Sequence, residues 1–402
     1  MTGVHVDRLM DPGLLAEAVR ERLVLARRHP TFPITIYSYS TKAQWSRAWT
    51  PVTVRCRGLV VHDDGRVLAR GWDKFFELSG AGSGLDPDVE VEATDKLDGS
   101  FVLLIDDLTV GPAFMCTRSG FANTQSVHAT ALWRSRYAGR WDPPVGWTVL
   151  FEVLFPANRI VVDYGPLDDL VLLGAVRTAT GEAIGPQDPL LSGWPGPRTA
   201  VLFRGALADA LALPSRPGTE GMVLRVLGTA PAVLAKVKER TYKDLHFRLT
   251  ETSERDVWER MAVDRWAPEI DRADGWARDL GIDPAKGERL RPSAGSLLTE
   301  LAEGVPDEFH SWLRRTESRI QAEVDAGAAL VSALAVRLRQ EHGQDRRAAF
   351  ESTRDHPAQK AVMRLLGGGS MRNAELWAWR RALPAGELKA WGASAQTAGP
   401  TA

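Results

Sequence analysis

The feature that most constrains the fold is a change of pattern near residue 250. From about residue 30 to 245, short runs of β-branched and aromatic residues alternate with Gly, Pro and Asp turns, which is typical of strands. From about residue 253 onward, apolar residues recur at helical spacing, and Ser253 is the expected N-cap of the first helix there. The sequence therefore predicts an α+β region followed by an all-helical region.

Six further stretches are predicted as helices. The stretch over 11–30 is amphipathic with interspersed charges, and the glycine-rich segment from Gly367 to Ser370 separates the stretches over 345–366 and 370–391. Residues 393–402 are expected to form a flexible tail. The predicted helices cover residues 11–30, 122–139, 199–212, 306–342, 345–366 and 370–391.

Composition limits the class of protein. The chain has 402 residues, of which 44% are apolar and 25% charged, the balance of an ordinary globular protein with room for two or three domains. Its net charge of −1 means that any surface for a polyanion must come from local clustering of cations. The two cysteines, Cys56 and Cys116, are far apart and are expected to be free thiols. With no apolar run of membrane-spanning length, we expect a soluble, cytoplasmic protein.

A Lys-x-Asp-Gly turn stands at the start of an apolar strand in "DKLDGSFVLLI". Asp-Gly is ordinary turn chemistry, so one interpretation is a tight turn and nothing more. The other is that the turn presents Lys96 as a nucleophile on a rigid sheet, with Asp98 and Gly99 forming the turn. The stretch alone does not decide between the two.

Two other polar features lie in predicted strands. Glu152 is embedded in "VLFEVLF", where it is either a buried, paired carboxylate or a residue of an exposed face. Lys236 and Lys238 share one strand face about 7 Å apart, so they either flank an anion or belong to a solvated edge strand. Lysines can hold phosphate, and carboxylates such as Glu152 and Glu220 can hold Mg²⁺ or ribose hydroxyls. The chain has no P-loop or dinucleotide-type glycine loop, which argues against kinase, GTPase and Rossmann classes.

The order of these motifs resembles a known superfamily. "KLDGS", "FEV", "EGMVL" and "AKVK" are similar to the nucleotidyltransferase motifs of covalent ligases and capping enzymes. "IYSYS", "CRGLVV", "DKFFEL" and "FEVLFPANRIVVDYG" most resemble the phage-type ATP-dependent RNA ligase 1 family, which repairs cleaved tRNA. The resemblance covers about residues 34–245. It implies a nucleotidyltransferase domain with antiparallel sheets over 1–248 and an all-helical domain over 249–392.

The resemblance also implies roles for individual residues. Lys96 would attack the α-phosphate of ATP and form lysyl-AMP, and Asp98 would serve the later steps. Glu152 and Glu220 would act on the ribose and on Mg²⁺ or Mn²⁺. Lys236 and Lys238 would bind the phosphates as catalytic cations. The expected nucleotide-binding residues are Tyr39, Arg57, Lys74, Lys96, Glu152, Glu220, Lys236 and Lys238.

Several neighbouring residues fit the family pattern less closely. Arg118, in "CTRSG", stands where lysine is common, although an arginine also clamps phosphate. Arg159 either contacts substrate or fixes its own loop. Tyr242 and Lys243 either contact RNA or begin the helical domain.

The implied function is an ATP-dependent RNA ligase that joins RNA 5′-phosphate and 3′-hydroxyl ends, such as those of broken tRNA, as a monomer. One alternative is a DNA ligase or capping enzyme, but these carry a β-rich OB domain where this chain turns helical. Another is an RNA-end-binding protein that no longer seals, and the intact lysines and glutamates argue against it.

The segment 345–381 has eight basic and four acidic residues, and Arg372, Arg380 and Arg381 flank two tryptophans in it. This composition suggests either an RNA-docking face or a Trp-lined core face.

Overall fold

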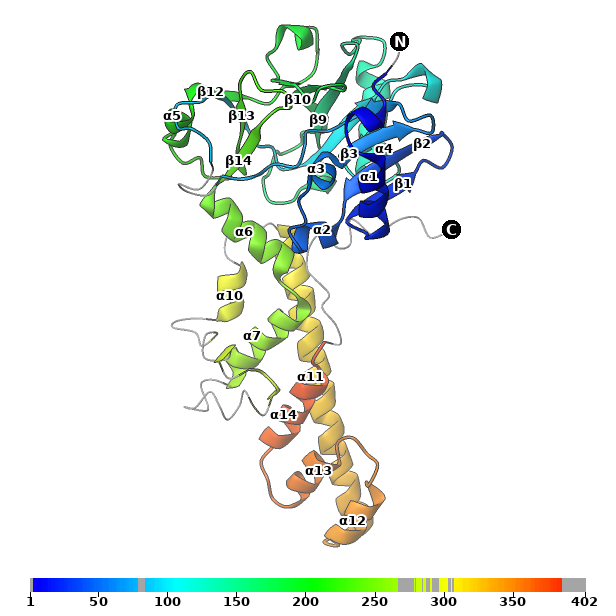
Figure 1. Cartoon of the computed structure of the whole chain (residues 1–402). Helices are drawn as coiled ribbons and strands as arrows, with labels where there is room; N and C mark the ends of the chain where they lie inside the picture. Colours follow the sequence, from blue (N-terminus) through cyan, green and yellow to red (C-terminus); the bar gives the residue numbers. More distant parts are fainter. Residues whose placement is uncertain are drawn as a thin grey trace. The chain divides into compact units, whose positions relative to one another are not determined.

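The computed structural model describes most of the chain in two compact units, with the division between Asp244 and Leu245 (Figure 1). Among the described residues, no helix combines the length and the apolar character needed to cross a membrane. The described residues are 3–78, 84–266, 278, 280–283, 285–286, 290, 296–302, 305 and 307–384.

A four-stranded antiparallel sheet, in the order β1-β2-β3-β4, begins the first unit. The predicted helix over 11–30 is wrong in its second half, because α1 ends at Arg20 and a strand comes next. Arg22 has a φ of 59°, a left-handed turn that redirects the chain, and Val24 then pairs with Tyr39. The elements are α1 (Pro12–Arg20), β1 (Val24–Arg28), β2 (Ile34–Tyr39), α2 (Thr41–Trp45), α3 (Pro51–Arg55), β3 (Arg57–His62) and β4 (Val67–Ala69).

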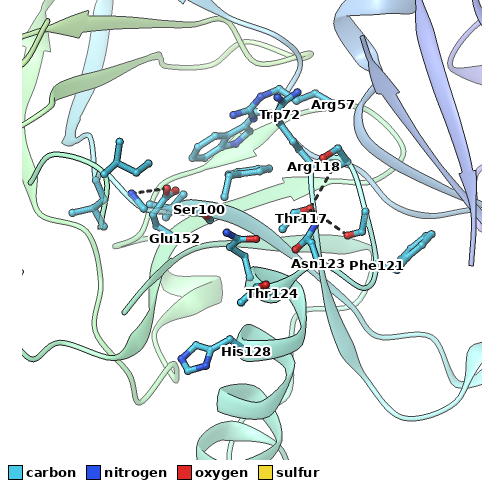
Figure 2. A pocket seen from close by; sticks show the side chains of 18 of the residues that line it. Arg57, Trp72, Ser100, Thr117, Arg118, Phe121, Asn123, Thr124, His128 and Glu152 are labelled. Carbon is cyan, nitrogen blue, oxygen red and sulfur yellow. Dashed lines mark hydrogen bonds between the residues drawn. The ribbon is translucent and has the colours of Figure 1, made fainter. Parts of the chain in front are cut away.

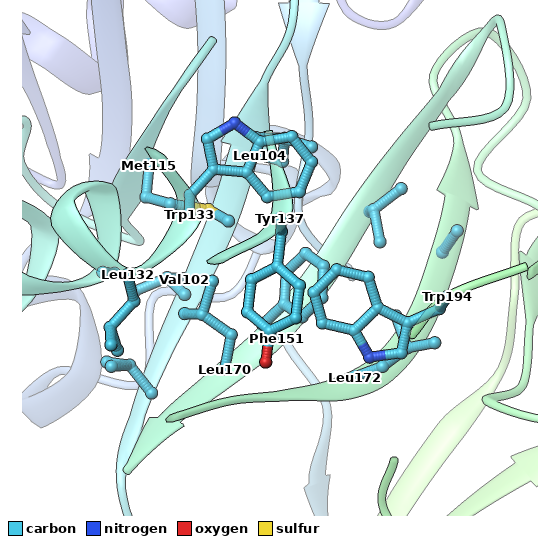
Figure 3. Close-up of a cluster of buried hydrophobic side chains, with 14 of the residues drawn as sticks. Val102, Leu104, Met115, Leu132, Trp133, Tyr137, Phe151, Leu170, Leu172 and Trp194 are labelled. Carbon is cyan, nitrogen blue, oxygen red and sulfur yellow. The ribbon is translucent and has the colours of Figure 1, made fainter. Parts of the chain in front are cut away.

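The second sheet has the order β11-β10-β9-β7-β8 and is antiparallel throughout. One face packs on α4 and the turn after it, whose Trp133 and Tyr137 meet Trp194 and Phe151 in the apolar cluster of Figure 3. The helix predicted over 122–139 is confirmed as α4 followed by a π-helical turn over Trp133–Tyr137. The elements are β7 (Ser100–Ile105), β8 (Phe114–Thr117), α4 (Thr124–Leu132), β9 (Trp147–Leu154), β10 (Asp169–Arg177) and β11 (Ala183–Ile184).

The third sheet has the order β12-β6-β13-β14-β5, with only the short β5 in parallel pairing. The helix predicted over 199–212 is wrong in its first half, where the backbone pairs with β6 as a strand and only Leu207–Leu211 are helical. The elements are β5 (Phe76–Glu77), β6 (Glu90–Asp95), β12 (Val201–Ala206), α5 (Leu207–Leu211), β13 (Gly221–Val226) and β14 (Leu234–Lys238).

The sheets confirm the predicted α+β class with antiparallel pairing. Buried residues of β3, β7, β8 and β10 share one apolar cluster, so the first two sheets enclose a common core. Cys56 and Cys116 are both buried free thiols, as predicted. Short 3₁₀ turns occupy Val6–Arg8, Leu108–Val110, Pro156–Asn158 and Pro189–Leu191.

In the described part of the chain beyond Leu245, the regular elements are all helices, as predicted. The Ser253 hydroxyl accepts from the Asp256 N–H at 3.2 Å, which confirms its capping role. The helix predicted over 345–366 is instead two, because the chain turns before Pro357, which lacks an N–H. Residues 385–391 and the predicted tail 393–402 lie outside the described residues. The elements are α6 (Arg240–Glu251), α7 (Glu254–Trp266), α10 (Leu297–Ala302), α11 (Asp307–His342), α12 (Arg346–Ser352), α13 (Gln359–Leu366) and α14 (Arg372–Arg381).

Candidate active site

A cavity of about 1320 Å³ lies within the first unit and is lined by residues from all three sheets (Figure 2). Six of the residues predicted for the nucleotide site line it, and they come from separate parts of the chain. Glu220 and Lys238 adjoin the cavity lining, because Glu220 forms ion pairs with both Lys96 and Lys238. The predicted residues in the lining are Tyr39, Arg57, Lys74, Lys96, Glu152 and Lys236.

Lys96 lies in the link between β6 and β7, as the turn sequence predicts. Its backbone N–H donates to the carbonyl of Gly221 at 3.0 Å, which ties the link to the start of β13. Its Nζ lies 2.6 Å from Oε2 of Glu220, and Nζ of Lys238 lies 3.0 Å from Oε1 of the same carboxylate. Glu220 is buried, so this carboxylate fixes the positions of two lysine ammonium groups.

The link has no room for a side chain at Gly99. The Gly99 N–H donates to Oε1 of Glu152 at 3.2 Å, and a Cβ at this position would collide with the Leu154 side chain and lie 2.6 Å from the Val153 carbonyl. Glycine is therefore required by the close approach of β9.

Gly99→Ala is expected to displace the Lys96 link, because the new methyl group would meet backbone atoms that cannot move independently. We expect at least a tenfold fall in the rate of any covalent reaction at Lys96, measured by mass spectrometry of the intact chain. Gly3→Ala is the control, since a Cβ there meets nothing closer than 3.8 Å. A Gly99→Ala variant with the rate of wild type would contradict this account of the link.

Asp98 is held by protein donors on both of its oxygens. Oδ1 accepts from the Tyr242 hydroxyl at 2.7 Å, and Oδ2 accepts from the N–H groups of Val161 and Val162 at 2.8 and 2.9 Å. The Asp98 N–H in turn donates to the Tyr164 hydroxyl at 2.8 Å. This arrangement favours a positioning role for Asp98, and its predicted role in later catalytic steps stays a prediction. Tyr242, for which the sequence allowed two interpretations, is buried, and its hydroxyl donates to this carboxylate.

Aromatic rings and cations form another part of the cavity lining. Arg118 and Lys74 lie 4.9 and 5.2 Å from the Tyr39 ring centre, and Arg57 lies 4.3 Å from that of Phe101. Burial alone would raise the pKa of Tyr39, but Arg118, Arg57 and Lys74 outweigh it and lower that pKa. Burial lowers the pKa of Lys74 and of Arg57. Arg118, a loosely fitting position in the sequence, is thus part of the site.

Arg57 brings a buried donor without an acceptor to this part of the cavity. Nη1 of Arg57 is buried and has no hydrogen-bond partner among the described residues. A buried guanidinium donor without an acceptor is costly, and an anionic ligand in the cavity would satisfy it.

Glu152 and Lys236 have strongly shifted pKa values. Burial raises the pKa of Glu152 to about 8, and the charge of Glu220 adds to this, while Lys96 and the Gly99 N–H oppose it. Burial lowers the pKa of Lys236 to about 8, and the cations of Lys74, Lys238 and Lys96 add to that shift. A polyphosphate between these groups would relieve the repulsion between the lysines.

Glu152→Gln is expected to remove a pH dependence of stability. The native Glu152 carboxyl keeps its proton up to about pH 8, whereas the unfolded one loses it near pH 4.5. Between these values the native state binds more protons, so the free energy of unfolding falls as pH rises. Urea unfolding of the two proteins at pH 4.5, 6 and 8 should show the wild type losing a few kcal/mol relative to Glu152→Gln. Parallel curves would contradict the assignment.

The predicted metal ligands are only partly free to bind a metal. Among the described residues, no three His, Cys, Asp or Glu side chains are grouped as a metal site. Mg²⁺ needs only one or two carboxylates when phosphates and waters complete its shell. Glu152 accepts one N–H and fits such a ligand, whereas Glu220 is ion-paired through both oxygens. The metal role of these residues stays a prediction.

The cavity also has a second polar group, which combines Ser100 of "KLDGS" and Asn158 of "FEVLFPANRIVVDYG" with residues of α4 that no sequence motif marks. Ser100, Asn158 and Gln125 are joined by hydrogen bonds, and His128 pairs with Asp168. Gln125 and His128 become neighbours of Ser100 only when α4 packs beside β7, so local sequence gives no signal for these two residues.

Arg159 and Lys243, each with two interpretations from the sequence, lie outside the cavity lining. Arg159 pairs with Asp163 at 3.0 Å, within its own loop, and Lys243 pairs with Glu77. The Arg159 pair favours the interpretation in which this arginine fixes its loop.

In the helical unit, the arginine and tryptophan cluster includes core residues. Trp379 is buried, and its carbonyl accepts from Nε1 of Trp258 at 3.0 Å. Trp377 is half-buried, and its Nε1 donates to the Pro357 carbonyl at 3.1 Å. Trp379 therefore cannot stack on a base, which favours the core interpretation for this residue.

Comparison with family models and with curated proteins finds no match. Several solved structures are similar, and they are ATP-dependent ligases of DNA or RNA. A protein of Aquifex aeolicus assigned as an ATP-dependent DNA ligase shares 14% identity over 77% of this chain and 81% of its own, with a TM-score of 0.45. An archaeal ATP-dependent RNA ligase shares 13% over 79% and 81%, with a TM-score of 0.44. A Naegleria gruberi RNA ligase variant, solved with ATP and Mn, shares 17% over 39% and 52%, with a TM-score of 0.30.

Proposed function

We propose that the protein is an ATP-dependent RNA ligase that joins 5′-phosphate and 3′-hydroxyl ends through a lysyl-AMP intermediate. One observation carries the proposal. The Lys96 amine lies 2.6 Å from a buried carboxylate, on a cavity that also holds the cations of Arg57, Lys74 and Lys236. A lysine nucleophile held in place by a carboxylate and placed among cations fits attack on a phosphate.

In the first step, the Lys96 ammonium loses its proton to solvent and the freed lone pair attacks the α-phosphorus of ATP. The Nζ–P bond forms as the bond from the α-phosphorus to the bridging oxygen breaks, and pyrophosphate leaves. Lys236 and Lys238 neutralise the charge that develops on the leaving group. A divalent ion held by Glu152, Mg²⁺ or Mn²⁺, would add charge neutralisation at the phosphates.

The later steps transfer the adenylate and seal the strand. An oxygen of the RNA 5′-phosphate attacks the phosphorus of lysyl-AMP, the Nζ–P bond breaks, and Lys96 regains its proton. The 3′-hydroxyl then attacks the activated 5′-phosphate, forming a phosphodiester and releasing AMP. Asp98, fixed by Tyr242 and the loop after Arg159, keeps the Lys96 link in place through these steps.

RNA rather than DNA is proposed because the chain turns helical after the last lysine motif. DNA ligases and capping enzymes place a β-rich OB domain there, whereas the described residues beyond Leu245 form helices. Repair of broken tRNA is the physiological role that the family resemblance suggests, and the enzyme is proposed to act as a monomer in the cytoplasm.

Incubation of the protein with α-labelled ATP and Mg²⁺ tests the first step. We expect a covalent AMP adduct that survives denaturation, and its absence from the wild-type protein would contradict the proposal. The adenylated protein is then challenged with nicked DNA, nicked duplex RNA and single-stranded RNA carrying a 5′-phosphate. Sealing of RNA is expected, while sealing of nicked DNA alone would identify a DNA ligase.

A further inference from the structure

The cavity has a second wall that the reaction at Lys96 does not use. It consists of one face of α4 together with Ser100 at the start of β7, and Figure 2 shows Thr124 and His128 along this helix below Ser100. The α4 residues in the lining lie at helical spacing, so they form a continuous face about two turns long. In contrast to the lysine and arginine wall, the face bears no lysine or arginine. Its residues are Thr124, Gln125, Val127, His128 and Ala131.

Hydrogen bonds connect this wall to the site of the nucleophile. Nε2 of Gln125 donates to Oδ1 of Asn158 at 3.1 Å, and Nδ2 of Asn158 donates to the Ser100 hydroxyl at 3.0 Å. Ser100 pairs with Val153, next to Glu152, and lies four residues after Lys96. These bonds orient the Gln125 amide, whose Oε1 accepts no hydrogen bond from the described residues.

His128 is held in one orientation at the far end of the wall. Its Nε2 lies 2.6 Å from Oδ1 of Asp168, and its ring packs on Phe155 with 4.2 Å between ring centres. Because a carboxylate accepts, Nε2 carries a hydrogen, which leaves Nδ1 for another partner. The wall thus offers two oriented polar atoms, Oε1 of Gln125 and Nδ1 of His128, and the Thr124 hydroxyl.

We propose that this α4 wall is a ribose-binding subsite for the terminal nucleotide of the RNA substrate, where Gln125 and His128 recognise the 2′-hydroxyl. The inference rests on the proposed function, and it identifies the part of the cavity at which the enzyme would distinguish RNA from DNA. A wall of hydrogen-bonding groups without lysine or arginine fits sugar hydroxyls better than phosphates, and the 2′-hydroxyl, which can donate and accept, is the group that DNA lacks. At about 1320 Å³ the cavity exceeds the usual range for one small ligand, which leaves space for a terminal nucleotide beside ATP.

Binding of an unreactive RNA end tests the subsite without catalysis. The full chain is titrated, without ATP, into a fluorescent 5′-phosphorylated RNA oligonucleotide. It is also titrated into the same oligonucleotide with a 2′-deoxy nucleotide at the phosphorylated 5′ end. We expect the deoxy end to bind about tenfold more weakly, the effect of one lost hydrogen bond to an oriented group. Gln125→Ala and His128→Ala should bring this ratio close to one, while Gln44→Ala, an exposed glutamine outside the cavity, should keep it.

The outcomes separate the inference from the proposed function. Equal binding of the two ends by the wild type, or an unchanged ratio in both variants, would overturn the subsite. Equal or tighter binding of an all-DNA end would overturn it in favour of a DNA site. A wild type that forms no AMP adduct yet discriminates the ends, with discrimination lost in the variants, would refute the ligase proposal and support the ribose subsite.

Discussion

Lys96→Ala is expected to abolish the covalent AMP adduct completely. The reason is chemical, because the Nζ lone pair of Lys96, which lines the cavity, forms the bond to phosphorus. Lys238 pairs with the Glu220 carboxylate, and Lys236 lies on the strand beside it. Intact-mass spectrometry after incubation with ATP and Mg²⁺ measures the adduct, and peptide mapping locates it.

Two variants distinguish loss of the nucleophile from loss of structure. Lys96→Arg keeps a cation for Glu220 but supplies no nucleophilic amine near neutral pH, so it should also form no adduct. Lys42→Ala removes an exposed lysine that donates to the Glu21 carbonyl and should label like the wild type. An adduct mapped to Lys236 or Lys238 would reassign the nucleophile.

Glu92→Ala is expected to lower the free energy of unfolding by about 3–5 kcal/mol. Glu92 is 1% exposed on β6, where Oε1 lies 2.8 Å from Nη2 of Arg225 and Oε2 lies 2.9 Å from Nε of Arg204. Removing the carboxylate leaves the largely buried Arg225 cation without its partner, which costs more than the ion pair itself contributes. Urea denaturation measures the change.

The loss of stability in the Glu92→Ala sheet should also affect the reaction at Lys96. Strand β6 pairs with both β12 and β13 and leads directly into Lys96, so a weakened β6 should also slow adduct formation. Glu90→Ala, at the exposed start of the same strand, is the control and should change stability by no more than about 0.5 kcal/mol. A Glu92→Ala protein as stable as this control would show that the arginines find other partners.

Local sequence pattern predicted the backbone structure correctly at turns and helix starts, where neighbouring residues decide the conformation. Asp-Gly after Lys96 predicted a turn between strands, and Ser253 predicted a helix start, and both are observed. The pattern failed at 199–206, where an apolar run compatible with either a helix or a strand becomes β12 because β6 offers an unpaired edge. Pairing with a strand a hundred residues away is invisible to local spacing.

The sequence by itself determined that a strand-rich region precedes a helical one, because turn chemistry and side-chain periodicity are local properties. The antiparallel pairing and the set of site residues were predicted from the family resemblance. Only the tertiary structure decided how those residues act. It paired Lys96 with Glu220, raised the pKa of Glu152 by burial, surrounded Asp98 with donors, and brought Gln125 and His128 of α4 beside Ser100. Burial and charge pairing depend on segments far apart in the chain, so these properties exist only once the sheets are assembled.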